Sequence, residues 1–389
     1  MTLIFLIVVT VVCLSVTSSI YKKYWDYGLD ATVFFEKDKI EEGQCVVLKE
    51  RIENRKWLPL PTLMLKFGMD RSLQCTDSIH TSVTDKQYRN DSIPIMANER
   101  VTRSVEIMGT QRGFYGIEEI RLVATDILFR SILNKTSENQ TFVYVYPSRS
   151  KFVRLPEIFQ YMYGECISKQ FLQEDSMEFR GIREYTQADP MRRINWKASA
   201  KSGNLKVNQY YDSSSQRLTI FLTVSQSGIL KYYDLIEESI RIARNFIEAF
   251  IGKGIPVRII SNGVDKITGQ EIRIREGAGL AHIDACLKQL AKMDIYAPSR
   301  GMDEMIREQS LLEEGEVSLL ISAEQTVELA TAYLGYAGVE GSANWLIPIH
   351  RTTQSYLEEN VSDVKMRGRS GAHIRTEYLV MEELEEYGI

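Results

Sequence analysis

Residues 217–224, RLTIFLTV, decide the fold of the C-terminal half of the chain. The run is almost continuously apolar, as expected for a strand of a parallel sheet that helices cover on both faces. A long amphipathic segment follows over residues 232–252, with apolar residues at helical spacing. Gly252 and Gly254 are typical of the end of a helix. The sequence therefore predicts a strand followed by a helix.

The same alternation continues to residue 349. We predict further strands over 255–261, 316–322 and 343–349, and further helices over 280–292 and 324–334. Strands that alternate with helices are joined by right-handed crossovers and form a mostly parallel sheet. We therefore expect a Rossmann-like α/β domain over residues 216–350, followed by a C-terminal extension over residues 351–389.

The N-terminus carries an apolar stretch. Residues 3–16, LIFLIVVTVVCLSV, are almost continuously apolar, and the stretch extends to Ile20, which is long enough to span a bilayer as a helix. No basic residue precedes it, which argues against a secretory signal peptide. Lys22 and Lys23 follow it, and positive charge on that side favours a cytoplasmic body. The sequence predicts a single-pass anchor over residues 1–21 in the cell membrane.

Two regions separate the anchor from the α/β domain. Residues 28–148 contain short segments of alternating apolar and polar residues, with strands expected at 62–67, 100–108, 116–124 and 141–146. Short strands between polar turns are typical of an antiparallel β-sandwich. Residues 149–215 form a connecting region, with a short helix expected at 155–163. The whole chain is thus predicted to be a multidomain α+β protein.

Composition and motifs give no sign of catalysis. The net charge of −5 argues mildly against a nucleic-acid-binding protein. The five cysteines are scattered without a CxxC pair, so they suggest neither a zinc site nor a disulfide framework. None of the four histidines lies in a catalytic motif, and Glu276-Gly277-Ala278-Gly279 is too short for a dinucleotide fingerprint. We therefore expect that the protein is not an enzyme and has no small-molecule substrate. The alternative is a hydrolase whose active site matches none of these motifs.

The loop after the first α/β strand is the candidate ligand site, because ligands of open α/β sheets bind at the carboxyl ends of the strands. It contains Thr223, Ser225 and Ser227 at alternate positions. The pattern resembles the D-x-S-x-S sequence of von Willebrand factor A domains, whose oxygens help to hold Mg²⁺. Thr223 stands at the aspartate position, so we expect no cofactor. The hydroxyls are then simply helix caps.

Residues 183–201 combine many charges with aromatic residues. One interpretation is a nucleic-acid patch in which basic side chains contact phosphates and Trp196 stacks on a base. The interleaved acids Glu184 and Asp189 instead favour an internal network of arginine–carboxylate pairs. We favour the network and expect no nucleic-acid partner. Asp189→Ala should then destabilise the protein by leaving buried arginine donors unpaired.

This segment resembles a known family signature. Its residues Arg183, Tyr185, Asp189, Arg192, Trp196 and Lys201 follow the R-x-Y-x-x-G-D-x-x-R-x-I-x-W-x-x-x-A-R pattern of the domain of unknown function 58 family. Ala188 and Lys201 stand where the family often has Gly and Arg. The sequences QRGFY at 111–115 and YVYP at 144–147 resemble two further parts of the family pattern.

The resemblance implies a membrane anchor, an N-terminal β domain and a von Willebrand factor A-like domain. Members of the family are often encoded beside MoxR-type AAA+ ATPases, which implies such an ATPase as partner. The expected function is that of a membrane-anchored scaffold in the assembly or maturation of other proteins. An extracellular adhesion protein that binds its ligand through a cation, Mg²⁺, at Ser225 and Ser227 is the alternative.

Overall fold

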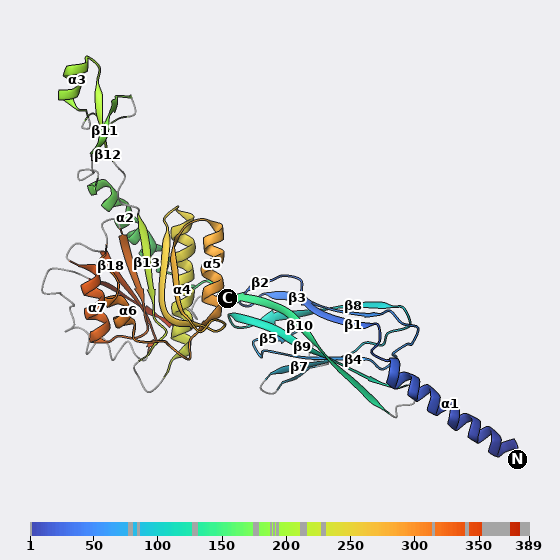
Figure 1. The fold of residues 1–389 in the computed structure, drawn as a ribbon. Helices are drawn as coiled ribbons and strands as arrows, with labels where there is room; N and C mark the ends of the chain where they lie inside the picture. The colour runs from blue at the N-terminus through green and yellow to red at the C-terminus, as the bar shows by residue number, and fades with distance from the viewer. Residues whose placement is uncertain are drawn as a thin grey trace. The chain divides into compact units, whose positions relative to one another are not determined.

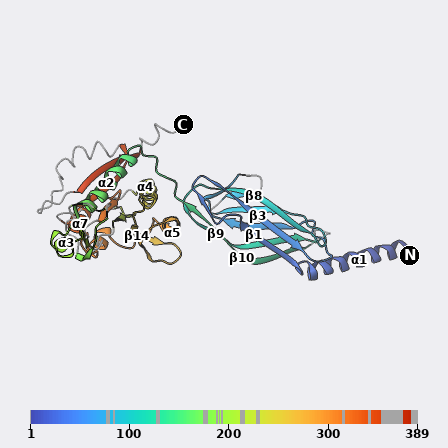
Figure 2. The ribbon, with the colours of Figure 1, turned by 90° about the horizontal axis from the view of Figure 1, so that it is seen from above.

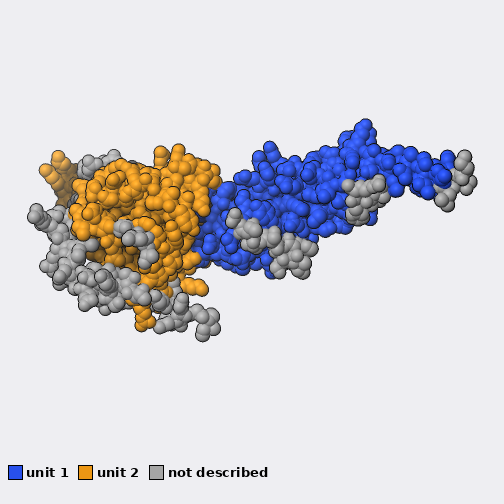
Figure 3. Space-filling model, turned by 90° about the horizontal axis from the view of Figure 1, so that it is seen from below, with its two compact units in different colours: residues 1–148, 290–292 blue, residues 149–289, 293–389 orange. Residues whose placement is uncertain are grey.

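The computed structural model describes residues 2–381 apart from 77–80, 84–85, 127–130, 174–178, 187–188, 190, 192–193, 211–215, 227–230, 313–315, 339–341 and 352–373. The chain divides into two compact units (Figure 3). The first comprises residues 1–148 with 290–292, and the second comprises residues 149–289 with 293–389.

Helix α1, Thr2–Tyr24, begins the first unit. It is long and apolar enough over Ile4–Tyr24 to cross a membrane, which confirms the predicted N-terminal apolar helix. Its last turn differs from the rest, because Tyr21 and the following Trp25 are buried in the core of unit 1. The Tyr21 hydroxyl also donates a hydrogen bond to the Pro59 carbonyl at 2.9 Å. These contacts carry the helix past residue 21 and attach it to the β domain.

Unit 1 is a β-sandwich, as the alternating segments predicted (Figure 1, Figure 2). Its four-stranded sheet has the order β1 (Leu29–Phe35), β3 (Cys45–Asn54), β8 (Arg100–Gly109), β5 (Leu73–Cys75). Its six-stranded sheet has the order β2 (Lys39–Glu41), β10 (Ile132–Tyr146), β9 (Gly113–Thr125), β4 (Met64–Met69), β7 (Gln87–Ser92), β6 (Thr81–Val83). All neighbouring strands are antiparallel except β2 and β10.

The sandwich core follows from the period-two pattern of the strands. Alternate residues of β3, including Leu48 and Ile52, are fully buried while their neighbours face outward.

Gly113, the first residue of β9, is required by the close approach of an aromatic ring. The Tyr115 ring lies over it, so a Cβ at this position would overlap the ring. The Tyr115 hydroxyl donates to the Arg112 carbonyl at 3.0 Å and fixes that close approach.

Unit 2 is built on a seven-stranded sheet. The order is β15 (Glu271–Gly277), β14 (Val257–Asp265), β13 (Arg217–Leu222), β17 (Glu316–Ile321), β18 (Ser342–Ile349), β19 (Ile374–Val380), and β16 (Met293–Asp294) pairs with β14. Its helices are α2 (Leu155–Gln173), α4 (Tyr233–Gly252), α5 (Leu280–Lys292), α6 (Met302–Arg307) and α7 (Val327–Ala337). The five strands from β14 to β19 in this order are parallel.

Helices cover both faces of this sheet (Figure 1). Phe221, Leu320 and Trp345 lie in register on neighbouring strands and share a core with α6 and α7. Helix α4 packs on the sheet and on α2, where Phe250 meets Phe159 edge to face with centroids 5.1 Å apart. Burial on both faces explains why β13 and β17 read as continuous apolar runs.

The sheet differs from the predicted one at both edges. Strand β15 is antiparallel to β14 and leads directly into α5, and Glu276 and Gly277 are its last residues. Strand β19 pairs in parallel with β18, although it comes from residues 351–389, which the sequence analysis set apart as an extension. Edge strands have one neighbour and a mixed polar pattern, so the apolar run that marks the central strands is missing from them.

The connecting region also contains more structure than expected. Helix α2 is longer than the predicted segment at 155–163. Strands β11, Phe179–Glu184, and β12, Lys206–Tyr210, form a separate two-stranded antiparallel sheet. Helix α3, Trp196–Ser202, lies between them in sequence. We call the segment from β11 to β12 the signature arm, because it contains the whole family-like pattern.

Candidate functional site

The carboxyl edge of the parallel sheet in unit 2 gathers a cluster of polar side chains. Thr223 and Ser225 follow β13, Asn262 lies on β14, and Glu324 follows β17. The Thr223 and Ser225 hydroxyls are 2.9 Å apart, and the Ser225 hydroxyl donates to Glu324 Oε2 at 2.7 Å. Parallel strands present their carboxyl ends at one edge, so residues far apart in sequence meet here. The D-x-S-x-S-like pattern pointed to Thr223 and Ser225, whereas no sequence pattern pointed to Asn262 or Glu324.

Asn262 organises this cluster. Its side chain is fully buried, and its Oδ1 accepts hydrogen bonds from the Val224 amide at 2.9 Å and the Thr223 hydroxyl at 3.3 Å. Its Nδ2 donates to Ser225 Oγ at 3.2 Å and to the Arg300 carbonyl at 3.1 Å. All hydrogen-bonding groups of the amide are therefore used within the protein, which fixes the loop after β13 in one conformation.

The cluster resembles a cation site only in part. Thr223, Ser225 and Asn262 offer neutral oxygens, and Glu324 is the carboxylate among these residues. Mg²⁺ is held by hard oxygen ligands, with carboxylates supplying the charge. The hydroxyl proton of Ser225 points at Glu324, so a cation would have to break that hydrogen bond before using either oxygen. Ser227, the other predicted ligand, lies outside the described residues.

The described histidines make other contacts. His350, which follows β18, lies 2.9 Å from Asp234 in the first turn of α4. His282 Nε2 lies 2.9 Å from the Val257 carbonyl. His80 and His373 lie outside the described residues. Among the described residues, the hydrogen bonds of Ser225 therefore lead to Thr223, Glu324 and Asn262, and none of these partners is an imidazole.

The signature arm is the second candidate region. Asp189 accepts hydrogen bonds from both terminal nitrogens of Arg183, at 2.7 and 2.5 Å. The same carboxylate accepts from the amide and the hydroxyl of Thr186, both at 2.8 Å. The Arg183 contacts, followed by those from Thr186, lower the pKa of Asp189. The pair therefore closes the turn after β11 with a bidentate, charged contact.

This pairing matches the predicted arginine–carboxylate network, but the predicted burial is wrong. The Arg183 side chain is 41% exposed, because a two-stranded sheet buries little on either face. The signature residue Arg192 lies outside the described residues. Asp189→Ala would therefore leave Arg183 hydrated instead of leaving a buried cation unpaired.

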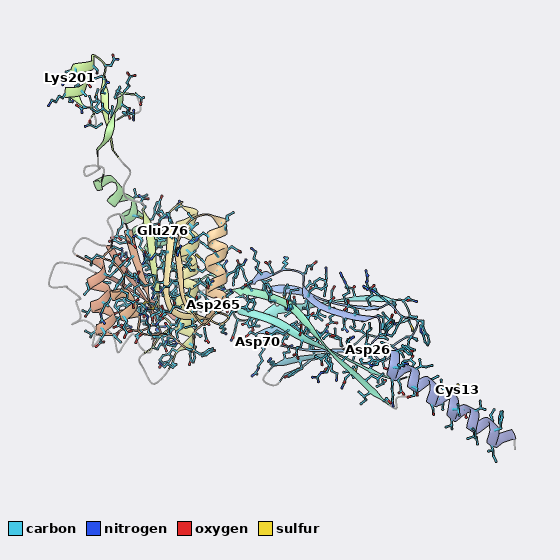
Figure 4. All side chains as sticks on the ribbon, viewed as in Figure 1. Cys13, Asp26, Asp70, Lys201, Asp265 and Glu276 are labelled. Atoms are coloured by element: carbon cyan, nitrogen blue, oxygen red, sulfur yellow. The ribbon has the colours of Figure 1, made fainter. Side chains whose placement is uncertain are left out.

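Helix α3 completes the arm. The Asn195 side chain caps it by accepting from the Ala198 amide at 2.9 Å, and Gly203 ends it with a positive φ. Lys201 lies in the last turn of α3, where its positive charge interacts favourably with the negative end of the helix dipole (Figure 4). The Tyr185 amide donates to the Leu205 carbonyl at 3.0 Å and joins the two sides of the arm.

Large apolar side chains stay exposed on this arm. Trp196, the signature tryptophan, is 66% exposed at the start of α3. Ile182, Met191 and Leu205 are exposed as well. The arm buries Ile194 and Val207 instead, which face each other across an isolated bridge. The apolar residues that the sequence places among the charges thus divide between a small core and an exposed surface.

Comparisons with known proteins give little further guidance. No protein-family model matches the chain. The chain is similar to the uncharacterized protein YeaD of Bacillus subtilis (strain 168), with 23% identity over 256 residues that cover 60% of this chain and 62% of that protein. The chain therefore spans less than two thirds of the length of that relative.

Similar solved structures match about a third of the chain. The CARDB domain of the PF1109 protein from Pyrococcus furiosus covers 30% of this chain and 93% of its own, with 16% identity and a TM-score of 0.21. A non-cellulosomal cohesin from Archaeoglobus fulgidus covers 29% of this chain and 91% of its own, with 14% identity and a TM-score of 0.20. Similarity at this level carries no argument about function.

Proposed function

We propose that the protein is a membrane-anchored scaffold that binds a MoxR-type AAA+ ATPase and takes part in the assembly or maturation of other proteins. In this proposal α1 spans the cell membrane, with the basic pair Lys22 and Lys23 and the soluble body on the cytoplasmic side. The second unit is a von Willebrand factor A-like domain of the domain of unknown function 58 family. No enzymatic activity, nucleic acid or small-molecule substrate enters the proposal.

The observation that carries this proposal is the exposed tryptophan of the signature arm. Trp196 stays exposed although the Asn195 cap and the Arg183–Asp189 pair order the residues on both sides of it. A large aromatic side chain that is already held in one conformation loses little conformational entropy when a partner covers it. Exposed tryptophans with neighbouring apolar residues are typical of the centre of a protein interface. The arm therefore has the properties of a docking element for a protein.

The carboxyl edge of the sheet supports the same conclusion. Its polar groups bond to one another, with Asn262 joined to both Thr223 and Ser225. Glu324 accepts a hydrogen bond from the Ser225 hydroxyl, so the polar groups of this edge are satisfied within the protein. The extracellular adhesion alternative needs a cation at these oxygens, and the hydrogen bonds do not favour it.

Direct binding tests the proposal. The full-length protein, purified in detergent or nanodiscs, is mixed with the purified MoxR-type AAA+ ATPase of the same genome in the presence of nucleotide. We expect saturable binding, and we expect Trp196→Ala to weaken it about tenfold or more, because interface tryptophans commonly contribute 2 kcal/mol or more.

The matched control is Trp57→Ala. Trp57 is 67% exposed and Trp196 is 66% exposed, but Trp57 lies in unit 1. We expect ATPase binding to this variant to equal that of the wild type. If the wild type does not bind the ATPase, the partner is wrong. If both variants bind as tightly as the wild type, the signature arm is not the docking element.

A further inference from the structure

One end of unit 1 can be traced from the strand registers. In the four-stranded sheet, Leu29 at the start of β1 lies opposite Asn54 at the end of β3. Glu53 lies opposite Arg100, the first residue of β8. The end of α1, the β3–β4 connection at 55–63 and the β7–β8 connection at 93–99 therefore lie at the same end of the sandwich.

The six-stranded sheet has its matching end here as well. Met64 at the start of β4 lies opposite Ser92 at the end of β7. Ile132, the first residue of β10, lies opposite Thr125, the last residue of β9. Connections 55–63 and 93–99 link the two sheets, so all these termini face the same side. We call this end of the sandwich the α1 end; Asp26, just after the helix, is labelled there in Figure 4.

The α1 end carries large apolar side chains that are exposed in the described part of unit 1. Tyr27 follows α1, Trp57 lies in the β3–β4 connection, Met96 lies in the β7–β8 connection and Ile132 begins β10. All four are more than half exposed. They come from four separate segments of the chain, and Tyr27, Trp57 and Met96 lie in connections, where polar residues are the usual choice.

A contact between α1 and the sandwich determines how close the α1 end lies to a membrane that α1 spans. The Ser18 hydroxyl donates to Asp126 Oδ2 at 2.8 Å, just after the end of β9. Ser18 lies six residues before Tyr24, so the sandwich overlaps roughly the last 9 Å of α1 at a rise of about 1.5 Å per residue. The headgroup layer on each side of a bilayer is only about 5–8 Å thick.

The sandwich therefore has little room to stay outside the bilayer. The candidate span Ile4–Tyr24 has 21 residues, a length of about 32 Å at about 1.5 Å per residue, and it includes Ser18, which contacts the sandwich. The hydrocarbon core is about 30 Å thick. A spanning α1 thus draws the α1 end of the sandwich into the headgroup layer.

We infer that the α1 end is a second membrane contact, in which Tyr27, Trp57, Met96 and Ile132 insert into the interface between headgroups and acyl chains. This inference rests on the proposed spanning role of α1. Tyrosine and tryptophan are favoured at that depth because their rings are apolar and their polar groups reach water.

The charges around the patch fit the same surface. Lys22 and Lys23 end α1, and the exposed Arg55 and Arg100, which both pair with Glu53, flank the connections that carry Trp57 and Met96. Basic side chains at this level can contact lipid phosphates. With both a helix and a surface held by the bilayer, unit 1 keeps a fixed orientation to the membrane instead of swinging on a single tether.

Quenching by brominated lipids tests the inference. The full-length protein is reconstituted in nanodiscs whose phosphatidylcholine carries bromine near the top of the acyl chains, and tryptophan emission is compared with unbrominated nanodiscs. The variants are Trp57→Phe and, as the equally exposed control, Trp196→Phe. Trp25 and Trp345 are present in both variants. We expect Trp57→Phe to lose about half or more of the bromine-quenched emission, and Trp196→Phe to lose none of it.

The outcomes separate the two proposals. If the protein does not co-elute with nanodiscs, α1 is not an anchor and the proposed function fails. If the protein co-elutes but Trp57→Phe retains the wild-type quenching, the anchor stands and the second membrane contact is overturned. If the control loses the quenched emission instead, the signature arm and not the α1 end meets the bilayer, which also overturns the inference.

Discussion

Glu50 in unit 1 and Glu316 in unit 2 are carboxyl groups at nearly the same burial, with residue exposures of 0% and 2%. Glu316 accepts hydrogen bonds from Thr219, from Tyr336 at 3.0 Å and from Arg217 at 3.0 Å. Burial alone would raise the pKa of Glu316, but these donors, Arg217 above all, outweigh burial and lower it. Glu316 is therefore an ordered anion inside the α/β unit.

Glu50 lies in a different arrangement. Arg89 Nε is 3.4 Å from Glu50 Oε1, but the guanidinium donates to Asp91 instead, with Nη2 at 3.0 Å from Oδ1. Neither oxygen of Glu50 accepts a hydrogen bond from the described residues. Burial, and next the neighbouring carboxylate of Asp91, raise the pKa of Glu50 to about 8. Glu50 is therefore protonated at neutral pH and can share its proton with Asp91.

The comparison teaches that donors, and not burial, set the charge of an interior carboxyl group in this protein. Unit 2 keeps its buried acid charged because strand β13 and helix α7 supply three donors to it. Unit 1 keeps its buried acid neutral because Asp91 uses the donors of Arg89, and also pairs with Arg103 at 2.9 Å. The two units should respond differently to mutation and to pH.

The largest effect is expected from Arg89→Met, which removes the buried partner of Asp91 and leaves that carboxylate with Arg103 alone. Loss of one partner of a buried ion pair commonly costs about 3–5 kcal/mol. We expect a loss of that size in the free energy of unfolding of unit 1, measured by urea titration with hydrogen exchange of its strands. The control Arg51→Met, at an exposed position of β3, should change it by less than about 0.5 kcal/mol. A loss below about 1 kcal/mol for Arg89→Met would show that the cluster is hydrated.

A pH titration sharpens the comparison further. Between pH 4.5 and about 8, folded unit 1 holds a proton on Glu50 that the unfolded chain releases. Stability must therefore fall as pH rises through this window, by up to about 1.4 kcal/mol per pH unit. Groups facing Glu50 are Arg89 and Asp91 on β7, Arg103 on β8 and Cys75 on β5.

Two matched variants identify the source of that slope. Glu50→Gln removes the titrating group and should flatten the dependence of unit 1 on pH between 5.5 and 8. Glu316→Gln should leave the slope of unit 1 intact. The pKa of Glu316 is lowered by folding, so its ionised form stabilises the protein at pH values above its unfolded pKa, and this stabilisation is lost only as the solution becomes more acidic. A slope that persists in Glu50→Gln would contradict the assignment.

The smallest effect is expected from Asp189→Ala in the signature arm. The Arg183 side chain is 41% exposed, so water screens the pair and we expect no measurable change in the unfolding midpoint of unit 2. The local effect should be clear, because the Thr186 amide loses its acceptor. Faster hydrogen exchange at Thr186, with Glu184→Ala as an exposed control, measures this loosening. Unchanged exchange would show that the turn is held by other contacts.

Much of the sheet in unit 2 could be predicted from the sequence. The central strands β13, β14 and β17 are buried on both faces and therefore appear as apolar runs. The edge strands β15 and β19 lack this signal, since their polar residues face solvent on one side. The candidate site was predictable in part for the same reason. Thr223 and Ser225 follow the strongest strand signal, and Asn262 and Glu324 also stand at or just beyond the predicted ends of strands.

The hydrogen bonds within the candidate site could not be predicted from the pattern of apolar residues. That Asn262 bonds to both Thr223 and Ser225 depends on the neighbouring positions of β14 and β13 in the sheet. The arm shows the same limit. The sequence indicated that Arg183 pairs with a carboxylate, but the exposure of Trp196 depends on which side of a two-stranded sheet its helix occupies.

By itself the sequence determined the apolar helix, the alternating strands of the sandwich and the strand–helix order of the α/β unit, because these depend on local periodicity. Only the tertiary structure decided which polar groups meet. Glu50 and Arg89 lie on strands of different sheets, and Ser18 meets Asp126 across 108 residues. Such contacts depend on register and packing, and no local pattern in the chain encodes them.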